Sequence, residues 1–446
     1  MNDCFFGVSN PGRFVPEQTV GLSKMRVLTG VGIVVAFVAT GLAAAPVEVL
    51  QSPRPVSRPV ERMSKVEPAP APAKAQGFQD WLAGFRPRAI AHGISPKVLD
   101  RAFRGVSYDA NVVRRDRNQS EFTKTIWGYL ETATSDLRIS NGKAALKAQQ
   151  GNLDAIERRY GVDRQIITAI WGLESAYGTF RGKTPVIGAL ASLAFDARRS
   201  AFFEEQLLAA LTILQSGDTA ADKMTGSWAG AMGHTQFMPG SFLEYAVDFT
   251  GDGRRDIWSD DPGDALASAA AYLKAHGWVE GQPWGVEVTL PKGFDYLLAN
   301  RSITRNPAEW AGIGVTDLNG NTVPDHGKGA VLLPAGAGGA AFMIFDNFAV
   351  LETYNTADAY VIGVGHLADR IGGGPPIQGR WPVQDRALTY DERIELQQRL
   401  TRAGFDTEKI DAKIGPLTIA AVRAYQVASG LVPDGYASLG LLNRLR

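Results

Sequence analysis

Cysteine is almost absent from this 446-residue chain, and its histidines are few and scattered. Cys4 is the single cysteine, so the chain has no disulfide framework. No two histidines stand at the spacing that zinc ligands need, and we therefore expect no catalytic zinc site. The five histidines are His92, His234, His276, His326 and His366.

A surplus of charge of either sign is also missing. Lysine and arginine together number 46, as do aspartate and glutamate, so the formal net charge is zero. A protein that binds nucleic acid through its overall field is basic, and we therefore expect no nucleic-acid partner. The 45% of hydrophobic residues is ordinary for a soluble globular protein, and the length allows more than one domain.

One long uncharged apolar run lies near the N-terminus, over residues 27–45. Lys24 and Arg26 precede it, and it ends in the small residues 43–45, which is the layout of an export signal. The run is nearly long enough to cross a bilayer, so a retained signal anchor is the alternative. We interpret residues 1–45 as an export signal or signal anchor. This predicts a periplasmic protein, either free or anchored in the inner membrane.

The composition divides the rest of the chain into four parts. Residues 46–77 are rich in proline and poor in large apolar residues, as in a linker. Residues 78–371 carry helical periodicity, with short β-type runs at 284–290 and 329–333 that predict a small β-containing insertion. The Gly/Pro-rich residues 372–386 resemble a second linker, and residues 387–446 form a small helical unit. The fold class that follows is mainly α.

Apolar periodicity predicts the longer helices of the large domain. Gly161 is expected to end one helix and Asp163 to cap the next. The expected helices cover 122–134, 144–160, 164–177, 200–215, 265–276 and 357–371.

One acidic residue stands in an otherwise apolar helix end. Glu174 follows Trp171 and Leu173, and such neighbours remove water from a carboxyl group and raise its pKa. A carboxyl group that is still protonated near neutral pH can donate a proton to a glycosidic oxygen. Composition alone favours a plainer interpretation, a surface Glu on an amphipathic helix.

Three motifs in register decide between these interpretations: Glu174-Ser175 with Gly178, then residues 230–233 (Gly-Ala-Met-Gly), then 236–239 (Gln-Phe-Met-Pro). Together they resemble the B-type family of lytic murein transglycosylases, over about residues 78–371. The resemblance implies a lysozyme-like fold with Glu174 as the catalytic acid. It also implies a lyase that cleaves the β-1,4 bond between N-acetylmuramic acid and N-acetylglucosamine in peptidoglycan, during remodelling or turnover of the cell wall. The product would carry a 1,6-anhydromuramoyl end.

The resemblance extends to residues that would bind substrate around Glu174. Tyrosine suits a glycan cleft because its ring packs on a sugar face while its hydroxyl bonds a sugar hydroxyl. His234 is a departure, since the family often has another residue there, and we assign it no catalytic role. The implied binding set is Ser175, Ser227, Gln236, Tyr129, Tyr272, Tyr354 and Tyr360.

A second catalytic carboxylate, which most glycosidases use, is missing near Glu174 in the sequence. Substrate assistance removes the need for it. By resemblance, the muramoyl N-acetyl oxygen attacks C1, and Glu174 then activates the C6 hydroxyl of the same sugar. The chemistry needs no cofactor.

Residues 248–259 follow much of the pattern of a calcium loop. Asp248, Thr250 and Asp252 offer oxygen ligands, a glycine takes the sharp turn, and the Arg254 carbonyl follows. Serine stands at the twelfth position, and the resemblance makes Asp264 the closing ligand. We predict a structural calcium ion, with an ion-free Gly/Asp turn as the alternative.

The C-terminal unit, 387–446, resembles the small three-helix peptidoglycan-binding domain. The pattern Asp411-Ala412-Lys413-Ile414-Gly415-Pro416 departs from the usual one only in the alanine after the aspartate. Peptidoglycan strands are therefore the expected partner. The competing functions are a muramidase that uses water and a non-catalytic wall-binding scaffold.

Overall fold

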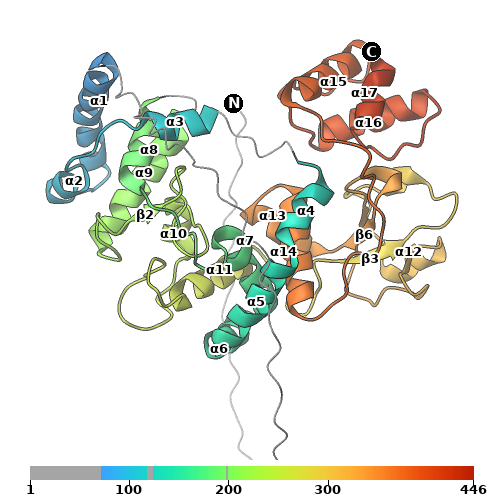
Figure 1. Cartoon of the computed structure of the whole chain (residues 1–446), viewed down its shortest axis with the longest axis horizontal. Coiled ribbons are helices and arrows are strands. Elements are labelled where there is room, and N and C mark those ends of the chain that lie inside the picture. Colours follow the sequence, from blue (N-terminus) through green and yellow to red (C-terminus); the bar gives the residue numbers. More distant parts are fainter. Residues whose placement is uncertain (1–71, 118–123, 197–198) are drawn as a thin grey trace, which may run out of the picture. The chain divides into compact units, whose positions relative to one another are not determined.

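The computed structural model describes residues 72–117, 124–196 and 199–446 (Figure 1). The predicted export signal, 1–45, lies outside the described residues, as does most of the expected linker 46–77. The end of that linker is different from the expectation, because α1 already begins at Pro72. No helix within the described residues combines the length and the apolar character needed to cross a membrane.

The fold is mainly helical, as the sequence predicts. Helix α7 lies at the centre of one core and packs against α14, α5, α11 and α6. A second core surrounds α8 and α9, which pack on each other, and α9 also packs on α10. The helices of the large domain are α1 (Pro72–Ala91), α2 (Pro96–Ala102), α3 (Ala110–Arg117), α4 (Ile126–Ala133), α5 (Asp136–Ala148), α6 (Gln150–Tyr160), α7 (Arg164–Ser175), α8 (Val186–Phe195), α9 (Ser200–Ser216), α10 (Pro239–Tyr245), α11 (Gly263–Ala275), α12 (Pro307–Gly312), α13 (Asp346–Tyr354) and α14 (Asp358–Ile371).

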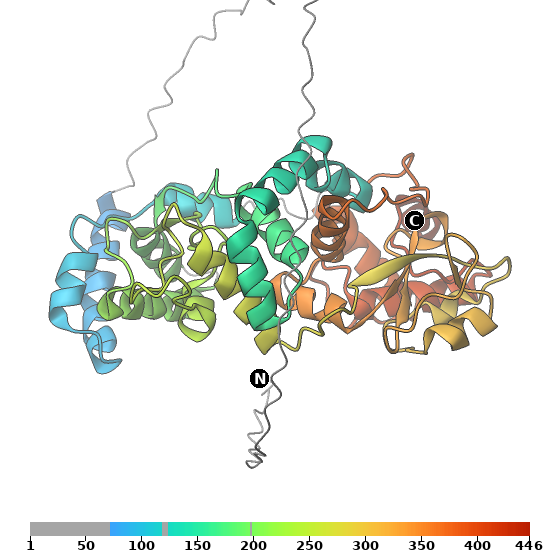
Figure 2. The same ribbon diagram turned by 90° about the horizontal axis from the view of Figure 1, so that it is seen from below.

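The β-containing insertion holds a four-stranded antiparallel sheet in the order β4-β3-β6-β5 (Figure 2, yellow to orange). Its strands are β3 (Gly285–Thr289), β4 (Thr316–Asp317), β5 (Ala330–Leu332) and β6 (Ala341–Ile344). The third core fills one side of this sheet, around the fully buried Trp310 of α12. Two short strands form a separate antiparallel pair, β1 (Thr184–Pro185) and β2 (Thr225–Gly226). Their hydrogen bonds connect the segment after α7 to the turn before residue 230.

Two expected helices differ from the structure. The range 144–160 is divided between α5 and α6, because the chain leaves helical geometry at Gln149, the cap that the two helices share. The range 122–134 is helical only from Ile126, and its first two residues lie outside the described chain. The end of α6 is as predicted, since Gly161 takes the left-handed conformation with φ of 68°.

The C-terminal unit contains three helices around a core of its own: α15 (Tyr390–Arg402), α16 (Pro416–Ala428) and α17 (Leu439–Leu445). Two hydrogen bonds connect it to the insertion. Arg423 donates to the Ala299 carbonyl, and the Ala337 amide donates to Asp434 Oδ2 at 2.9 Å.

Candidate active site

A sharp turn directly after α7 presents Glu174. Ala176 and Tyr177 both take left-handed backbone conformations, with φ of 48° and 58°, which non-glycine residues adopt only under strain. Gly172 makes the turn possible, because a β-carbon there would lie 2.6 Å from the Tyr177 ring. Strained backbone conformations of this kind cluster at functional sites, and here they fix the end of the helix that carries Glu174.

Ser175 fixes this turn and does not reach the cleft, contrary to its predicted role in substrate binding. It is 1% exposed, and its hydroxyl donates to the His234 carbonyl at 2.6 Å. The same oxygen accepts the Gly178 amide at 3.0 Å. Both bonds join α7 to neighbouring segments, so the hydroxyl has a structural role.

Within the part of the chain that the structure describes, the carboxyl group of Glu174 has one hydrogen-bond partner. The Tyr360 hydroxyl, from the start of α14, donates to Glu174 Oε1 at 2.6 Å. Burial raises the pKa of Glu174 to about 7, and the hydrogen bond from Tyr360 opposes part of that rise. The side chain keeps some solvent access. It is therefore a carboxylic acid that holds its proton up to neutral pH at an accessible position.

Four tyrosines of the predicted set gather around this acid. Tyr360 is 6% exposed and is engaged by Glu174, so it positions the acid more than it lines a surface. The Tyr354 hydroxyl donates to the Thr235 carbonyl at 2.7 Å, and burial raises the pKa of Tyr354 well above the usual value, with a further contribution from the charge of Glu174. Burial raises the pKa of Tyr129 to about 12, with a further contribution from Glu174. The Tyr272 ring lies 5.1 Å from that of Tyr354. The Tyr272 hydroxyl donates to the Thr353 carbonyl at 2.7 Å. Burial raises the pKa of all four tyrosines, so they keep their protons near neutral pH.

Residues 227–236 form a tight turn beside the acid. The Ser227 hydroxyl accepts the amides of Ala229 and Ala231 at 3.3 and 3.0 Å. Gln236 has a left-handed φ of 53°, and its amide nitrogen donates to the Gly233 and Arg181 carbonyls. The Gln236 amide oxygen meets no hydrogen-bond donor within the described residues, which leaves it available to a ligand.

A buried hydrogen-bonded chain behind the acid escaped the sequence interpretation. Trp171 Nε1 donates to His234 Nδ1 at 3.0 Å, and His234 Nε2 lies 2.8 Å from the Ser259 carbonyl. Arg181 donates to the same carbonyl. His234 is 4% exposed, so it supports the fold of the site and has no access to substrate. Gly178 was the one residue in the sequence that could have indicated this packing, because a β-carbon there would lie 2.6 Å from the His234 ring.

Three of the five predicted calcium ligands meet in the structure. Carboxylate oxygens of Asp248, Asp252 and Asp264 lie within 4.8 Å of one another. Asp264 is 2% exposed and accepts three backbone amides of the loop at 2.9 Å, which fixes the curve of the chain. A cluster of carboxylates suits a hard cation such as calcium. Thr250 and Arg254 are exposed on the same loop.

Comparison with known families assigns the chain. Residues 77–369 match the transglycosylase SLT domain. The chain belongs to this family. Residues 389–445 also match the putative peptidoglycan binding domain.

Individual relatives agree with the assignment. The chain is 35% identical over 240 residues to membrane-bound lytic murein transglycosylase B of Escherichia coli K12, a match that covers 52% of this chain and 63% of that protein. It is 49% identical to SltB3 of Pseudomonas aeruginosa, solved with NAG-anhNAM-pentapeptide; the match covers 83% of this chain and 100% of the other, with a TM-score of 0.81. The Escherichia coli transglycosylase Slt35, solved with calcium, is 29% identical to this chain. The match covers 67% of this chain and 94% of the Slt35 chain, with a TM-score of 0.57. The lysozyme-like fold class is thereby confirmed.

Proposed function

We propose that the protein is a lytic transglycosylase of the cell wall that cleaves the β-1,4 bond between N-acetylmuramic acid and N-acetylglucosamine. The observation that carries the proposal is Glu174, a half-buried acid whose pKa is raised to about 7 and which accepts a hydrogen bond from Tyr360. A group of this kind can protonate a leaving sugar at neutral pH. Family membership and the muropeptide complexes of SltB3 support the substrate class.

The reaction needs only Glu174 and the substrate. Glu174 gives its proton to the glycosidic oxygen, while the muramoyl N-acetyl oxygen attacks C1 and the C1–O bond breaks. The carboxylate then accepts the proton of the C6 hydroxyl, whose oxygen attacks C1 and expels the N-acetyl oxygen. This forms the 1,6-anhydro ring and restores protonated Glu174. The C6 hydroxyl competes well with water because it belongs to the same sugar.

The remaining residues of the site have supporting roles in this proposal. We propose that the Gln236 amide oxygen and the Ser227 hydroxyl bond sugar hydroxyls, and that the rings of Tyr129 and Tyr272 pack on sugar faces. Tyr354 and Tyr360 are positioning residues, because their hydroxyls are bonded to Thr235 and Glu174.

The product tests the proposal directly. We expect mass spectrometry of the soluble products from purified murein to show 1,6-anhydromuramoyl ends, which are about 18 mass units lighter than reducing ends and resist borohydride. Reducible muramic acid as the sole product would identify a muramidase. Uncut glycan strands would identify a binding protein.

We also propose that the loop around Asp252 holds a structural calcium ion. The cluster of Asp248, Asp252 and Asp264 and the calcium in the Slt35 structure support this. Thr250 and the Arg254 carbonyl complete the ligand set in the proposal. The ion would lock the loop that runs on to Ser259, which contacts His234 behind the acid.

Calcium should therefore raise the melting temperature of metal-free protein. Binding to the folded state alone stabilises it by mass action, and calcium at a hundredfold excess over its dissociation constant should add roughly 5 °C. Asp252→Ala should lose this rise, whereas Asp222→Ala, at an exposed position outside the loop, should keep it. A melting curve that millimolar calcium does not move would exclude the site.

Export and wall binding complete the proposed function. The signal-like residues 1–45 support a periplasmic location, with retention in the inner membrane as the alternative. The three-helix unit of residues 387–446 would hold the enzyme on peptidoglycan and raise its local concentration at the glycan strands.

A further inference from the structure

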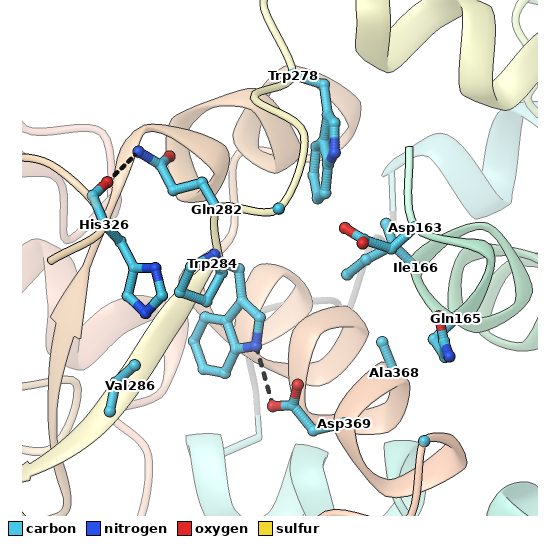
Figure 3. Close-up of a pocket in the computed structure, with 13 residues that line it drawn as sticks. Asp163, Gln165, Ile166, Trp278, Gln282, Trp284, Val286, His326, Ala368 and Asp369 are labelled. Carbon is cyan, nitrogen blue, oxygen red and sulfur yellow. Dashed lines mark hydrogen bonds between the residues drawn. The ribbon is translucent and has the colours of Figure 1, made fainter. Parts of the chain in front are cut away.

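A pocket lies at the opposite end of α7 from Glu174 (Figure 3). Asp163, at the start of α7, and Glu174, near its end, are separated by roughly 16 Å along the helix axis. The pocket has a volume of about 380 Å³. Its walls come from the start of α7, from the segment 278–286 that leads into β3, from the end of α14, and from His326.

The carboxyl group of Asp163 faces this pocket instead of capping α7. The sequence predicts a helix cap, and Asp163 does occupy the cap position, but its side chain makes no capping hydrogen bond. Glu157 Oε1 takes the Arg164 amide instead, at 3.0 Å. In Figure 3 the carboxyl oxygens of Asp163 point into the space between Trp278 and Trp284. This carboxyl group is thus available to a ligand.

Aromatic rings and a second carboxylate complete the walls. Trp278 and Trp284 are each 4% exposed, and Trp284 Nε1 donates to Asp369 Oδ2 at 3.1 Å. The ring of Trp284 is held tightly, because a β-carbon at Gly365 would lie 2.4 Å from it. Trp278 Nε1 is buried and has no hydrogen-bond partner within the described residues.

The ionisable side chains that line the pocket are two acids and one histidine, His326. Asp163 and Asp369 are the acids, and the lining includes neither lysine nor arginine. Burial raises the pKa of Asp163, and the charges of Glu157 and Glu280 add to the rise. A cation in the pocket would relieve this repulsion. Indole faces beside carboxylates are the surroundings that suit an ammonium group.

We propose that this pocket binds an aliphatic primary ammonium group. The ammonium would bond Asp163 and Asp369, its carbon chain would lie between the two indole rings, and an amide carbonyl of the same molecule would accept the Trp278 N–H. A lysine-like side chain in a peptide has all three features, whereas a free diamine lacks the carbonyl. The assignment of this peptide to the cell wall rests on the proposed function. The ammonium site itself does not depend on the proposed function.

Calorimetric titration of the full-length protein tests the site. The ligand is a lysine derivative in which the α-amino group is acetylated and the carboxyl group is a methylamide, so that its side-chain ammonium is the one charged group. We expect saturable binding, and a loss of at least about tenfold for the same compound acetylated on its side-chain amine, which has a similar shape but no charge. Asp163→Asn and Asp369→Asn should each weaken binding to a comparable extent. Asp222→Asn, a matched change at an exposed position outside the pocket, should leave it unchanged.

Cadaverine distinguishes the two sources of the ammonium group. Weaker binding of cadaverine than of the lysine derivative assigns the pocket to a peptide, and the reverse assigns it to a free diamine. Equal affinities for the charged and acetylated lysine, or unchanged affinity in both aspartate variants, would overturn the proposal. Lysis of glycan by Asp163→Asn is measured in parallel. Binding without any lysis by the wild type would reject the proposed enzyme and keep the pocket.

Discussion

Glu174→Gln should reduce lysis of purified murein by at least about a hundredfold while the protein stays folded. Glutamine keeps the size of the side chain and can still accept a hydrogen bond from Tyr360, but it has no proton to give to the leaving oxygen. Loss of a general acid typically costs between a hundredfold and ten-thousandfold in rate. A zymogram together with product release from soluble murein measures the loss.

Thermal unfolding at pH 8 supplies the control for this variant. The folded-state pKa of Glu174 is about 7, above that of an exposed glutamate, so the folded protein keeps the proton longer than the unfolded chain does. Stability from this group is therefore present at acidic pH and is lost as the pH rises toward 7. Above pH 7 the neutral glutamine should melt at the same temperature as the wild type or higher. Glu205→Gln, at an exposed position on α9, should leave lysis unchanged. Activity of Glu174→Gln within a few-fold of the wild type would place the acid elsewhere.

The helix that carries Glu174 could be predicted from the sequence, but the surroundings of the acid could not. Apolar periodicity gave α7 to within two residues of its observed end. The partner of the carboxyl group, Tyr360, lies 186 residues later in the chain. Periodicity carries no information on such a contact, and only the family resemblance placed both residues in one site. The same limit applies to Ser175, whose burial depends on the distant carbonyl of His234.

Predictions from residue type and periodicity were wrong where contacts between distant parts of the chain determined the structure. Asp163 has the residue type and position of a helix cap, yet Glu157 bonds the first amide of α7 and Asp163 turns to the pocket. Strand β6 is buried at all four positions, so it shows no alternation by which a strand could be recognised. In the loop at 248–264, Asp248, Asp252 and Asp264 come together as expected, and the hydrogen bonds that shape the loop connect residues close in sequence. The part played by Asp264 was expected from the family resemblance alone.

Tyr360→Phe should shift the alkaline limb of kcat/KM to higher pH. The reactive form of Glu174 is protonated, so kcat/KM for soluble murein fragments should be highest below pH 7 and fall as the pH passes through the pKa of about 7. The Tyr360 hydroxyl bonds the charged form of Glu174 and lowers this pKa. Removing the hydroxyl raises the pKa of Glu174 further, so kcat/KM should fall at a higher pH than in the wild type.

The same variant should lose about tenfold to a hundredfold of kcat on its acidic plateau, with little change in KM, because the freed carboxyl group no longer points at one place. Tyr390→Phe, on the exposed surface of α15, is the matched control and should change neither the rate nor the pH profile. A merely structural role for Tyr360 would lower the rate at every pH and leave the position of the alkaline limb unmoved. An alkaline limb that shifted downward would contradict the assignment of Tyr360 as the donor to charged Glu174, because loss of a bond to the charged form raises the pKa.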